Sequence, residues 1–564
     1  MPSQPEKQPP RCVLCSMCCP MGVEADPMGN MSTVFPLDLG YEQGACVRGL
    51  TAGRLLRGEN RIYEAASDGE TISVDEALDV LADQLKGYDG SEVGLLLDVN
   101  RPIELLSAAG TLEDWQVAAA VPPEDDPFVR TGGGAMPPLD QIAEADTVLA
   151  IGDPFSTHPV IAERVRDMQQ AGRGNKLVCV DTALGRTART ADEAIFVHPS
   201  KLAALLCAAA IEMRRKGVKQ ALNDTTPGSI CEEVGLSMDD VHAVANAIQD
   251  AESPAVIVSN STGRYACAGA AIRAIREMSS AAKTSFYALT SSPNTAAVRA
   301  LGEESGYVTQ AELLESVTNG DMKALVVVGA DLANMFPRAV IKELSDRLDV
   351  LGWAGSMRSR LMERVADITL PVALAWEEPG SVVLPGGEIG KTQAWMDRAR
   401  GVPTAEELLS TLVERAEVGN IDVDNAEVVH DLSEADVPIE EEVSDAVLDV
   451  AEADDDEAVL VGTPEPYAYT GGISLMDASW QLRTSAEEMA VLSPAAAEAV
   501  GVEEEQIVTL SGSTDMALPS LVRKGSDASV AAVAGHRNDV RGLLDWRIED
   551  GRIVIDPAVV KISV

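Results

Sequence analysis

Five cysteines near the N-terminus have the spacing most typical of metal chemistry. Cys12, Cys15, Cys18 and Cys19 fall within eight positions in RCVLCSMCCPMG, and Cys46 follows in QGACVRG. In a reducing cytosol, cysteines clustered in this way indicate a metal or redox site, because disulfides are rare there. The remaining four cysteines stand singly in apolar stretches and are expected to be core residues.

Three groupings of the five clustered cysteines can be compared. A ferredoxin-like C-x2-C-x2-C run over the first three needs a further Cys three residues on, where Gly22 stands. A zinc site needs two close pairs, and Cys46 has no close partner. The third grouping, C-x2-C-x3-C-x26-C, consists of Cys12, Cys15, Cys19 and Cys46. Four thiolates at this spacing can hold a [4Fe–4S] cluster, and the cysteine just before Cys19 is then a neighbour of the site.

The bulk composition indicates a large, acidic protein of several domains. The chain has 564 residues, more than one hydrophobic core accommodates, and a formal net charge of −46. Residues 417–457 hold 17 acidic and no Lys or Arg side chains, so the other 523 residues still carry −29 of the total −46. Such a surface repels phosphate groups, so binding to nucleic acids or anionic membranes is not expected.

Neither export nor membrane insertion is expected from the sequence. The start MPSQPEKQPPRC has no twin arginine and no apolar segment of the kind found in signal peptides. The chain also has no run of eighteen apolar residues. A cytoplasmic location is therefore the expectation.

From about residue 75, short apolar runs alternate with segments of helical spacing. HPVIAERVRDMQQ and AAIRAIREMSS have the period of helices. The alternation predicts an α/β fold with doubly wound parallel sheets and helices on both faces. The runs expected to form buried strands are residues 93–97, 147–152, 176–181, 255–260 and 324–329.

Five segments are expected along the chain. An iron–sulfur module at 1–65 precedes two α/β halves at 66–250 and 251–416. Residues 417–462 are expected to be a disordered linker, because they are acidic, lack basic residues and have few aromatic ones. Residues 463–564 are expected to form a small β-barrel, because short strand-like runs such as QIVTLSGS and RIVID alternate with turns.

Three turns directly after expected strands carry a Gly or an Asp. They are IGDPFSTHP with Gly152 and Asp153, VDTALGRT with Asp181, and VGADLANMFP with Gly329 and Asp331. In parallel sheets ligands bind beyond the carboxyl ends of strands. Turns of this kind bring backbone N–H groups or a carboxylate to a phosphate or a base.

Taken with its motifs, the chain resembles the molybdopterin oxidoreductase family. That family includes formate dehydrogenases, periplasmic nitrate reductases and the large iron–sulfur subunit of complex I. The cysteine spacing is similar, and four further segments resemble family segments in the correct order. They are IGDPFSTHPVIAERV, KLVCVDTALGRTARTADEAIFVHP, LGWAGSMRSRLMERVADITLPVALAWEEPGSVVLPGGEIG and MAVLSPAAAEAVGVEEEQIVTLSGS.

The resemblance implies two cofactors and a set of residues that hold them. Cys12, Cys15, Cys19 and Cys46 would bind a [4Fe–4S] cluster, and Arg48 would stand between the cluster and a pterin, where many relatives have Lys. A molybdopterin guanine dinucleotide with Mo or W would occupy clefts of the α/β halves, closed by the C-terminal molybdopterin-dinucleotide-binding barrel. The residues implied in its binding are Gly152, Asp153, Asp181, Gly329, Asp331, His536 and Asn538.

The sequence departs from catalytic relatives at the metal ligand. Those relatives supply Cys, selenocysteine, Ser or Asp between the first sheet strand and the segment that resembles IGDPFSTHP. Residues 98–146 contain no Cys, and the candidates there are Ser107, Asp125 and Asp126, which precedes a proline. The His and Arg pair that formate-oxidising relatives place beside the metal is not evident either.

Two interpretations of the function therefore remain open, and a third has less support. The chain is either a catalytic oxidoreductase subunit with a bis-pterin Mo or W site, formate dehydrogenase-like, or a non-catalytic electron-transfer and scaffold subunit without Mo or W. The third interpretation is that the chain resembles the molybdenum-binding subunit of formylmethanofuran dehydrogenase. That subunit usually has an active-site Cys and lacks a fused C-terminal barrel, and both features count against this interpretation. One cluster cannot complete a redox circuit, so partner subunits with further iron–sulfur clusters or a flavin are expected.

Overall fold

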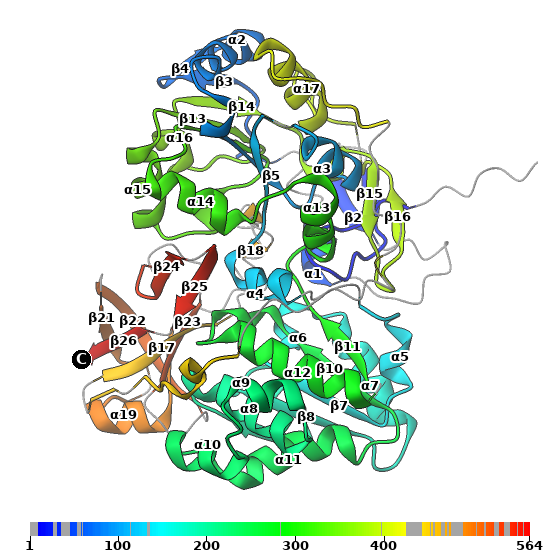
Figure 1. Cartoon of the computed structure of the whole chain (residues 1–564), viewed down its shortest axis with the longest axis vertical. Coiled ribbons are helices and arrows are strands. Elements are labelled where there is room, and N and C mark those ends of the chain that lie inside the picture. The colour runs from blue at the N-terminus through cyan, green and yellow to red at the C-terminus, as the bar shows by residue number, and fades with distance from the viewer. Residues whose placement is uncertain are drawn as a thin grey trace, which may run out of the picture.

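The structure is a computed structural model, in which the strands of the described residues form two large sheets, a closed barrel and four two-stranded sheets (Figure 1). The two large sheets have seven and five strands, and the barrel has six. The described residues are 9–25, 31–34, 46–52, 58, 60–112, 114–131, 136–282, 284–395, 397–424, 432, 443–451, 453–454, 457–463, 469–470, 473–474, 489–503, 505–512, 515–523, 530–534, 542–549, 551–556 and 558–564.

The seven-stranded sheet lies in the upper half of Figure 1 and has the order β4-β3-β14-β13-β12-β5-β6. Five neighbouring strands of this sheet are parallel, namely β14, β13, β12, β5 and β6. At the β14 side, β3 and β4 pair antiparallel and form one edge. The bounds are β3 Ala65–Ser67, β4 Glu70–Ile72, β5 Val93–Asp98, β6 Gln116–Ala120, β12 Ala324–Val328, β13 Val350–Gly355 and β14 Ile368–Pro371.

Side chains of successive residues in these strands point to opposite faces, and each face is covered by helices. In β5, Leu95 and Leu97 belong to one core and Leu96 to the other. This is why the strands read as continuous apolar runs. The first face packs against α2 (Val74–Leu85), α3 (Ile103–Ala109) and α17 (Ala405–Arg415), and the second against α14 (Gln310–Asn319) and α15 (Arg338–Arg347).

The five-stranded sheet lies in the lower half of Figure 1, is entirely parallel and has the order β11-β10-β7-β8-β9. One face packs on α8, whose residues Leu202–Ile211 are all buried, as expected for a helix that is apolar on every side. The strands are β7 Thr147–Ile151, β8 Lys176–Asp181, β9 Glu193–Phe196, β10 Pro254–Val258 and β11 Ser285–Ala288. The helices are α8 Leu202–Glu212, α10 Pro227–Val234, α11 Met238–Gln249 and α12 Ala268–Ala282 on one face, and α5 Asp140–Ala143 and α7 Ile161–Ala171 on the other.

The expected α/β class is confirmed, but the boundary expected between residues 250 and 251 does not separate the two sheets. The five-stranded sheet is built from residues 147–288, and the chain enters it after β6 and returns to the first sheet at β12. Each sheet therefore contains strands from both sides of residue 250. An apolar run predicts that a strand exists, but it does not say which other strand supplies its hydrogen bonds.

The C-terminal barrel has the order β17-β23-β20-β22-β21-β26 and lies at the lower left of Figure 1. A hairpin of β24 and β25 accompanies it and packs near α14. The bounds are β17 Glu457–Thr463, β20 Ala490–Leu492, β21 Ile507–Ser511, β22 Asp515–Val522, β23 Val530–Ala534, β24 Asp545–Glu549, β25 Arg552–Asp556, β26 Ala558–Ser563 and the short helix α19 Pro494–Val500.

The prediction of a disordered linker at 417–462 is wrong for the described part of that segment. Strand β17 begins at Glu457 and completes the barrel, and Val443 and Val447 are buried in the core of the five-stranded domain. Few apolar residues in an acidic segment are enough to dock it when a preformed surface is available. Within the described residues, no helix is long and apolar enough to cross a membrane.

Candidate functional site

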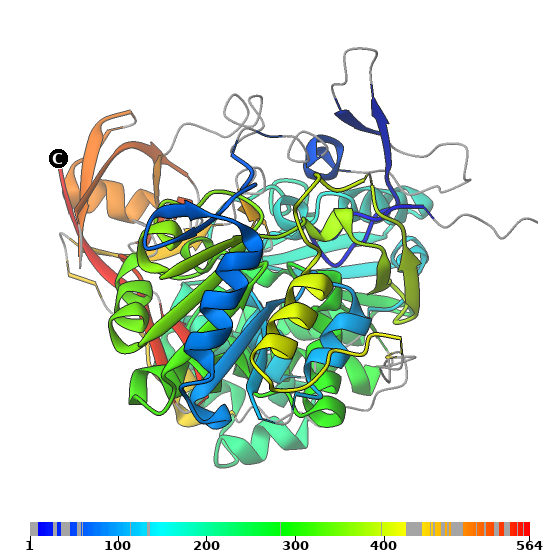
Figure 2. The same ribbon diagram turned by 90° about the horizontal axis from the view of Figure 1, so that it is seen from above.

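The N-terminal cysteine loop folds back on itself. The backbone N–H of Cys12 donates to the carbonyl of Cys19 at 2.9 Å, and that of Cys18 donates to the carbonyl of Cys15 at 3.2 Å. Cys18 has a φ of 45°, in the left-handed region, which reverses the chain before Cys19. Beyond the loop, β1 (Gly22–Ala25) pairs with β2 (Met31–Val34), and Figure 2 shows these two strands projecting well apart from the barrel.

Four cysteines line one cavity between this loop and the five-stranded domain. Cys12, Cys15, Cys19 and Cys46 all contribute to its wall, and the empty volume is about 320 Å³. Cys18 is buried but is not among the lining residues. The structure therefore brings together the same four cysteines that the spacing selects. Arg48 and His158 also line the cavity, together with Leu14, Met17, Met21, Gly49, Pro159 and Val160.

Burial favours the neutral form of three of these thiols, those of Cys12, Cys15 and Cys19. It raises the pKa of Cys12 and Cys19, and the neighbouring cysteines raise it further. Burial also raises the pKa of Cys15 to about 11, although Arg48 acts in the opposite direction. Four thiolates this close would repel one another, so ionisation of the set requires positive charge inside the cavity.

Arg48 supplies a positive charge at the wall of the cavity. The residue is only 4% exposed, and its guanidinium donates to the carbonyl of Thr157. Burial lowers the pKa of Arg48, but Cys46 and Cys15 more than offset that effect and raise it overall. The buried guanidinium lowers the pKa of Cys12 and Cys15, against the effect of burial, and so favours their thiolate form.

His158 was not selected by sequence reasoning, although it stands in the quoted turn IGDPFSTHP. Its ring is buried against the cysteine cavity, and its pKa is lowered to about 3 by burial and then by Arg48, so the ring is neutral. The signal that could have found it is its position seven residues after β7, where strand-end loops carry ligand contacts.

The predicted turn after β7 is present, but the carboxylate of Asp153 accepts hydrogen bonds from neighbouring loops of the protein. Gly152 has a φ of 77°, and a Cβ there would lie 2.6 Å from Ser261 Oγ, so glycine is required. Asp153 Oδ1 accepts from the backbone N–H and the hydroxyl of Thr187 at 3.0 and 2.7 Å. Its Oδ2 accepts from the Ser156 hydroxyl at 2.6 Å and from the Arg186 N–H at 3.0 Å. Asp153 thus ties the loop after β7 to the loop after β8.

Asp181, at the end of β8, lies beside Asp153. Its Oδ1 accepts from the Thr182 N–H at 2.8 Å and from the Tyr265 hydroxyl at 3.0 Å. Burial, followed by the charge of Asp153, raises the pKa of Asp181 to about 7.

The raised pKa of Asp181 predicts a pH-dependent contribution to stability. Because the folded pKa lies above the ordinary value of 3.8, the contribution is complete below that value and is lost as pH rises toward 7. Asp181→Asn keeps an oxygen for both donors and does not titrate. From about pH 5.5 to about 7, wild type should lose stability relative to Asp181→Asn by up to about 1.4 kcal/mol per pH unit. Urea-unfolding midpoints of both proteins check this, and a difference that does not change with pH would contradict it.

In the seven-stranded sheet, Gly329 and Asp331 line one cavity at the carboxyl ends of β12 and β13, with an empty volume of about 390 Å³. Gly329 has a φ of 83°, and a Cβ there would lie 2.5 Å from Arg101 Nη2. Asp331 Oδ1 accepts from the Ala333 N–H and the Ser359 hydroxyl, both at 3.0 Å. The two sheets thus share one local arrangement. In each, a glycine with positive φ follows the strand, and an aspartate just after it accepts hydrogen bonds that hold the loop.

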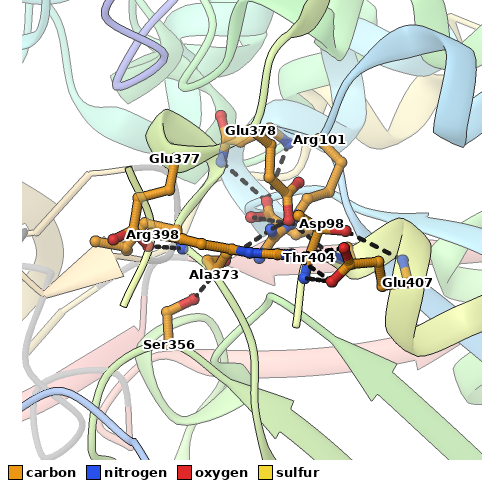
Figure 3. A network of polar contacts seen from close by, with 12 residues as sticks. Asp98, Arg101, Ser356, Ala373, Glu377, Glu378, Arg398, Thr404 and Glu407 are labelled. Carbon is orange, nitrogen blue, oxygen red and sulfur yellow. Dashed lines mark hydrogen bonds and ion pairs between the residues drawn. The ribbon is translucent and has the colours of Figure 1, made fainter. Parts of the chain in front are cut away.

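Asp98 and Arg101 line this second cavity and belong to a buried ionic network. Figure 3 shows that network. Arg101 Nη1 donates to the carbonyl of Ala373 at 2.8 Å and pairs with Glu378 Oε1 at 2.9 Å, and Asp98 Oδ2 lies 3.8 Å from its Nε. Glu378 also accepts from the N–H of Ala405 at 2.6 Å, at the start of α17. The network fixes the loop after β14, whose residues 374 and 375 line the cavity.

A second buried pair lies next to this network. Arg61 Nη2 and Nη1 donate to the two carboxylate oxygens of Glu377 at 2.8 and 3.2 Å, and both side chains are at most 1% exposed. Arg61 Nε also donates to the carbonyl of Ser356 at 3.2 Å. The pair therefore joins the chain after the N-terminal module to the loops after β13 and β14.

Two of the three candidates for a Mo or W ligand are engaged within the protein, and the hydroxyl of the third, Ser107, is buried without a hydrogen-bond partner among the described residues. Asp125 is fully buried and accepts from Ser291 N–H at 2.7 Å, from the Ser291 hydroxyl at 3.2 Å and from Asn260 Nδ2 at 3.3 Å. Burial, then Glu124, raises its pKa to about 8. Asp126 pairs with Arg130 at 2.8 Å, and Ser107 is buried within α3. His536 and Asn538 lie outside the described residues.

Comparison with solved structures places the fold in a known class. The two parallel sheets and the C-terminal barrel have the arrangement of a molybdopterin oxidoreductase fold, as the resemblance of the sequence predicts. Acetylene hydratase from Pelobacter acetylenicus superimposes with a TM-score of 0.68 over 98% of this chain and 100% of that chain. The sequences are 13% identical, so the likeness concerns the fold. No protein-family model and no curated protein matches the sequence.

Proposed function

We propose that this chain is an electron-transfer subunit that binds one [4Fe–4S] cluster through Cys12, Cys15, Cys19 and Cys46. The observation that supports this most is the common cavity of the four cysteines, which excludes Cys18 from its wall. The segments 12–19 and 46–48 are separate in the chain, so their convergence follows from the fold. When bound, the cluster accepts and donates single electrons.

The chemistry of the residues at the cavity suits an iron–sulfur cluster. Four cysteines line it, and thiolates are the ligands of such clusters. In the described part of the chain, no group of three or more His, Cys, Asp or Glu side chains is placed to hold a single metal ion. Arg48 lies at the same wall, where its charge would compensate that of a thiolate-ligated cluster.

A pterin dinucleotide is proposed as a second ligand on different grounds. The strand-end turns at Gly152 and Gly329 occur in both sheets, and the cavity at Gly329 contains the guanidinium of Arg101 and the amide of Asn334. These groups suit the phosphates and polar edges of a dinucleotide. Gly329, Arg101 and Asn334 would hold it, while Asp331 braces their loop. In the catalytic alternative, Mo or W on the pterin would add redox chemistry.

The catalytic version of this proposal has less support from the chain's own residues. Asp125 already accepts several hydrogen bonds, and Asp126 is paired with Arg130. We therefore favour an electron-transfer role without Mo or W, and formate oxidation rests on the sequence resemblance alone. The name of acetylene hydratase denotes a hydration, which shows that this fold does not decide the reaction.

Redox partners and a cytoplasmic location stay predictions. One cluster can receive or deliver electrons only if another carrier comes close to it, so we propose further subunits with iron–sulfur clusters or a flavin.

Elemental analysis of protein purified without oxygen tests the proposal. The purified protein is expected to contain about four Fe and four sulfide per chain. It should contain neither Mo nor W, even when the cells that produce it are supplied with both metals. One Mo or W per chain would establish the catalytic alternative and lead to Asp125→Ala and Asp126→Ala in search of its ligand. Zinc in place of iron would contradict the cluster assignment.

A further inference from the structure

The two cysteine segments are held by one dipeptide, Thr157–His158. This dipeptide ends the short helix α6 (Pro154–Thr157), which follows β7. Thr157 is in contact with the segment that contains Cys46, and His158 is in contact with the segment that contains Cys15. The loop after β7 therefore contacts two separate parts of the N-terminal module.

The hydrogen-bond partners of His158 define its tautomer. Nε2 lies 2.9 Å from the carbonyl oxygen of Thr290, which can only accept, so Nε2 carries the hydrogen. Nδ1 lies 2.9 Å from the Thr157 hydroxyl and accepts from it. Both ring nitrogens are therefore used, and the orientation of the ring is determined.

Ser16, directly after Cys15, is attached at the same point. Its backbone N–H donates to the carbonyl of Thr290 at 3.0 Å, and its hydroxyl accepts from the Thr290 N–H at 3.1 Å. His158 Nε2 lies 3.4 Å from that hydroxyl. The ring thus lies against the reciprocal pair that holds the Cys15 turn to the end of β11.

The other segment is attached through the first residue of the dipeptide. Arg48, two residues after Cys46, donates to the carbonyl of Thr157. A displacement of Thr157–His158 would therefore move both cysteine segments relative to each other.

The dipeptide is in turn anchored in the five-stranded domain. The Thr157 hydroxyl lies 2.9 Å from Ser259 Oγ, and Ser261 Oγ donates to Ser259 Oγ at 2.9 Å. All three side chains are buried, and Ser259 follows β10 directly. A chain of hydrogen bonds therefore runs from the end of β10 to the imidazole ring.

We infer that His158 is a positioning residue, which holds the Cys15 turn and, through Thr157, the Cys46 segment at the separation that a cluster needs. The inference rests on the proposed function. His158 contributes no ligand in this assignment. Its role is like that of residues that hydrogen-bond to metal ligands and orient them. Loss of such a residue typically lowers metal affinity by about 10- to 100-fold.

Three variants test the inference. His158→Leu removes both hydrogen bonds of the ring, and His158→Gln keeps a terminal amide that can donate to the Thr290 carbonyl. Ser16→Ala removes the hydroxyl that accepts from the Thr290 N–H and keeps the backbone bond to the Thr290 carbonyl. The matched control is His198→Leu, because His198 is also buried and its Nδ1 also accepts a local hydrogen bond, from the Ser200 N–H. His198 does not line the cysteine cavity.

The measurements are the rate of iron release to a chelator and the midpoint potential of the cluster in an EPR-monitored titration. His158→Leu should release iron about 10- to 100-fold faster than wild type, and Ser16→Ala should change the rate in the same direction. His158→Gln should restore most of the retention with a shifted midpoint potential. His198→Leu should match wild type in both measurements. Equal release rates and potentials in wild type, His158→Leu and Ser16→Ala would overturn the inference.

A readout on the metal-free protein separates this inference from the proposed function. In the metal-free wild type the buried Cys15 should react slowly with iodoacetamide, and it should react at least about tenfold faster in His158→Leu. If wild type contains no cluster but alkylation is accelerated, the proposed function fails and the positioning role stands. If wild type contains a cluster and the variants alter neither alkylation nor release, the positioning role fails alone. Should His158→Leu not fold, Ser16→Ala and His158→Gln decide the question.

Discussion

Cys46→Ser is expected to remove the cluster, or to leave a three-iron remnant. A serine hydroxyl at this position is a poor ligand for iron in place of a thiolate, and Cys46 lies on a segment far in sequence from the other three ligands. The Fe and sulfide content of anaerobically purified protein, which should be about four each in wild type, measures the effect.

Cys18→Ser is the matched control, because Cys18 is as buried as its neighbours but does not line the cavity. This variant should retain the full iron content of wild type. Loss of iron in Cys18→Ser, with retention in Cys46→Ser, would show that Cys18 is a ligand in place of Cys46 and that the grouping is wrong.

Glu377→Ala is expected to cost about 3–5 kcal/mol of stability, because it leaves the guanidinium of Arg61 buried without its carboxylate. The Leu374 N–H also loses its acceptor, Glu377 Oε2 at 2.8 Å. The shift of the urea-unfolding transition, measured by circular dichroism, checks this prediction.

Glu343→Ala is the control for the loss of a carboxylate opposite an arginine. Glu343 pairs with Arg347 at 3.3 Å on the surface of α15, and the side chains are 55% and 47% exposed. Its removal should change stability by at most about 0.5 kcal/mol. If Glu377→Ala and Glu343→Ala shift the transition equally, the buried pair does not support the loops after β13 and β14.

Features that depend on neighbouring residues could be predicted from the sequence. The strands at residues 93–97, 147–152 and 324–329 and the helix in HPVIAERVRDMQQ form where the apolar pattern places them. The cysteine grouping agrees with the cavity wall because the C-x2-C-x3-C spacing belongs to one local loop. Gly152 and Gly329 stand at the expected strand ends with positive φ.

Features that depend on distant partners could not be predicted. Asp153 and Asp331 were expected to face a ligand, but their oxygens brace loops through donors such as Thr187 and Ser359. The insertion of the five-stranded sheet between β6 and β12 depends on which strands pair. The role assigned to His158 depends on Ser16 and Thr290, which are more than 100 residues away along the chain.

The acidic segment shows a limit of reasoning from composition. The charge of residues 417–457 predicts disorder when it is averaged over the segment. Val443 and Val447 nevertheless lie in the core of the five-stranded domain, and β17 begins within the segment. The average composition of the segment is dominated by carboxylates, so it does not reveal the few apolar residues that pack into the core.

Mössbauer spectroscopy of the protein, produced with 57Fe and purified without oxygen, tests directly whether Cys12, Cys15, Cys19 and Cys46 bind one four-iron cluster. It reports how many iron atoms share one cluster and whether that cluster accepts an electron. The spectrum of a single four-iron cluster is expected in wild type and in Cys18→Ser, and its loss is expected in Cys46→Ser. Mononuclear iron, a two-iron centre, or a four-iron cluster that persists in Cys46→Ser would contradict the assignment.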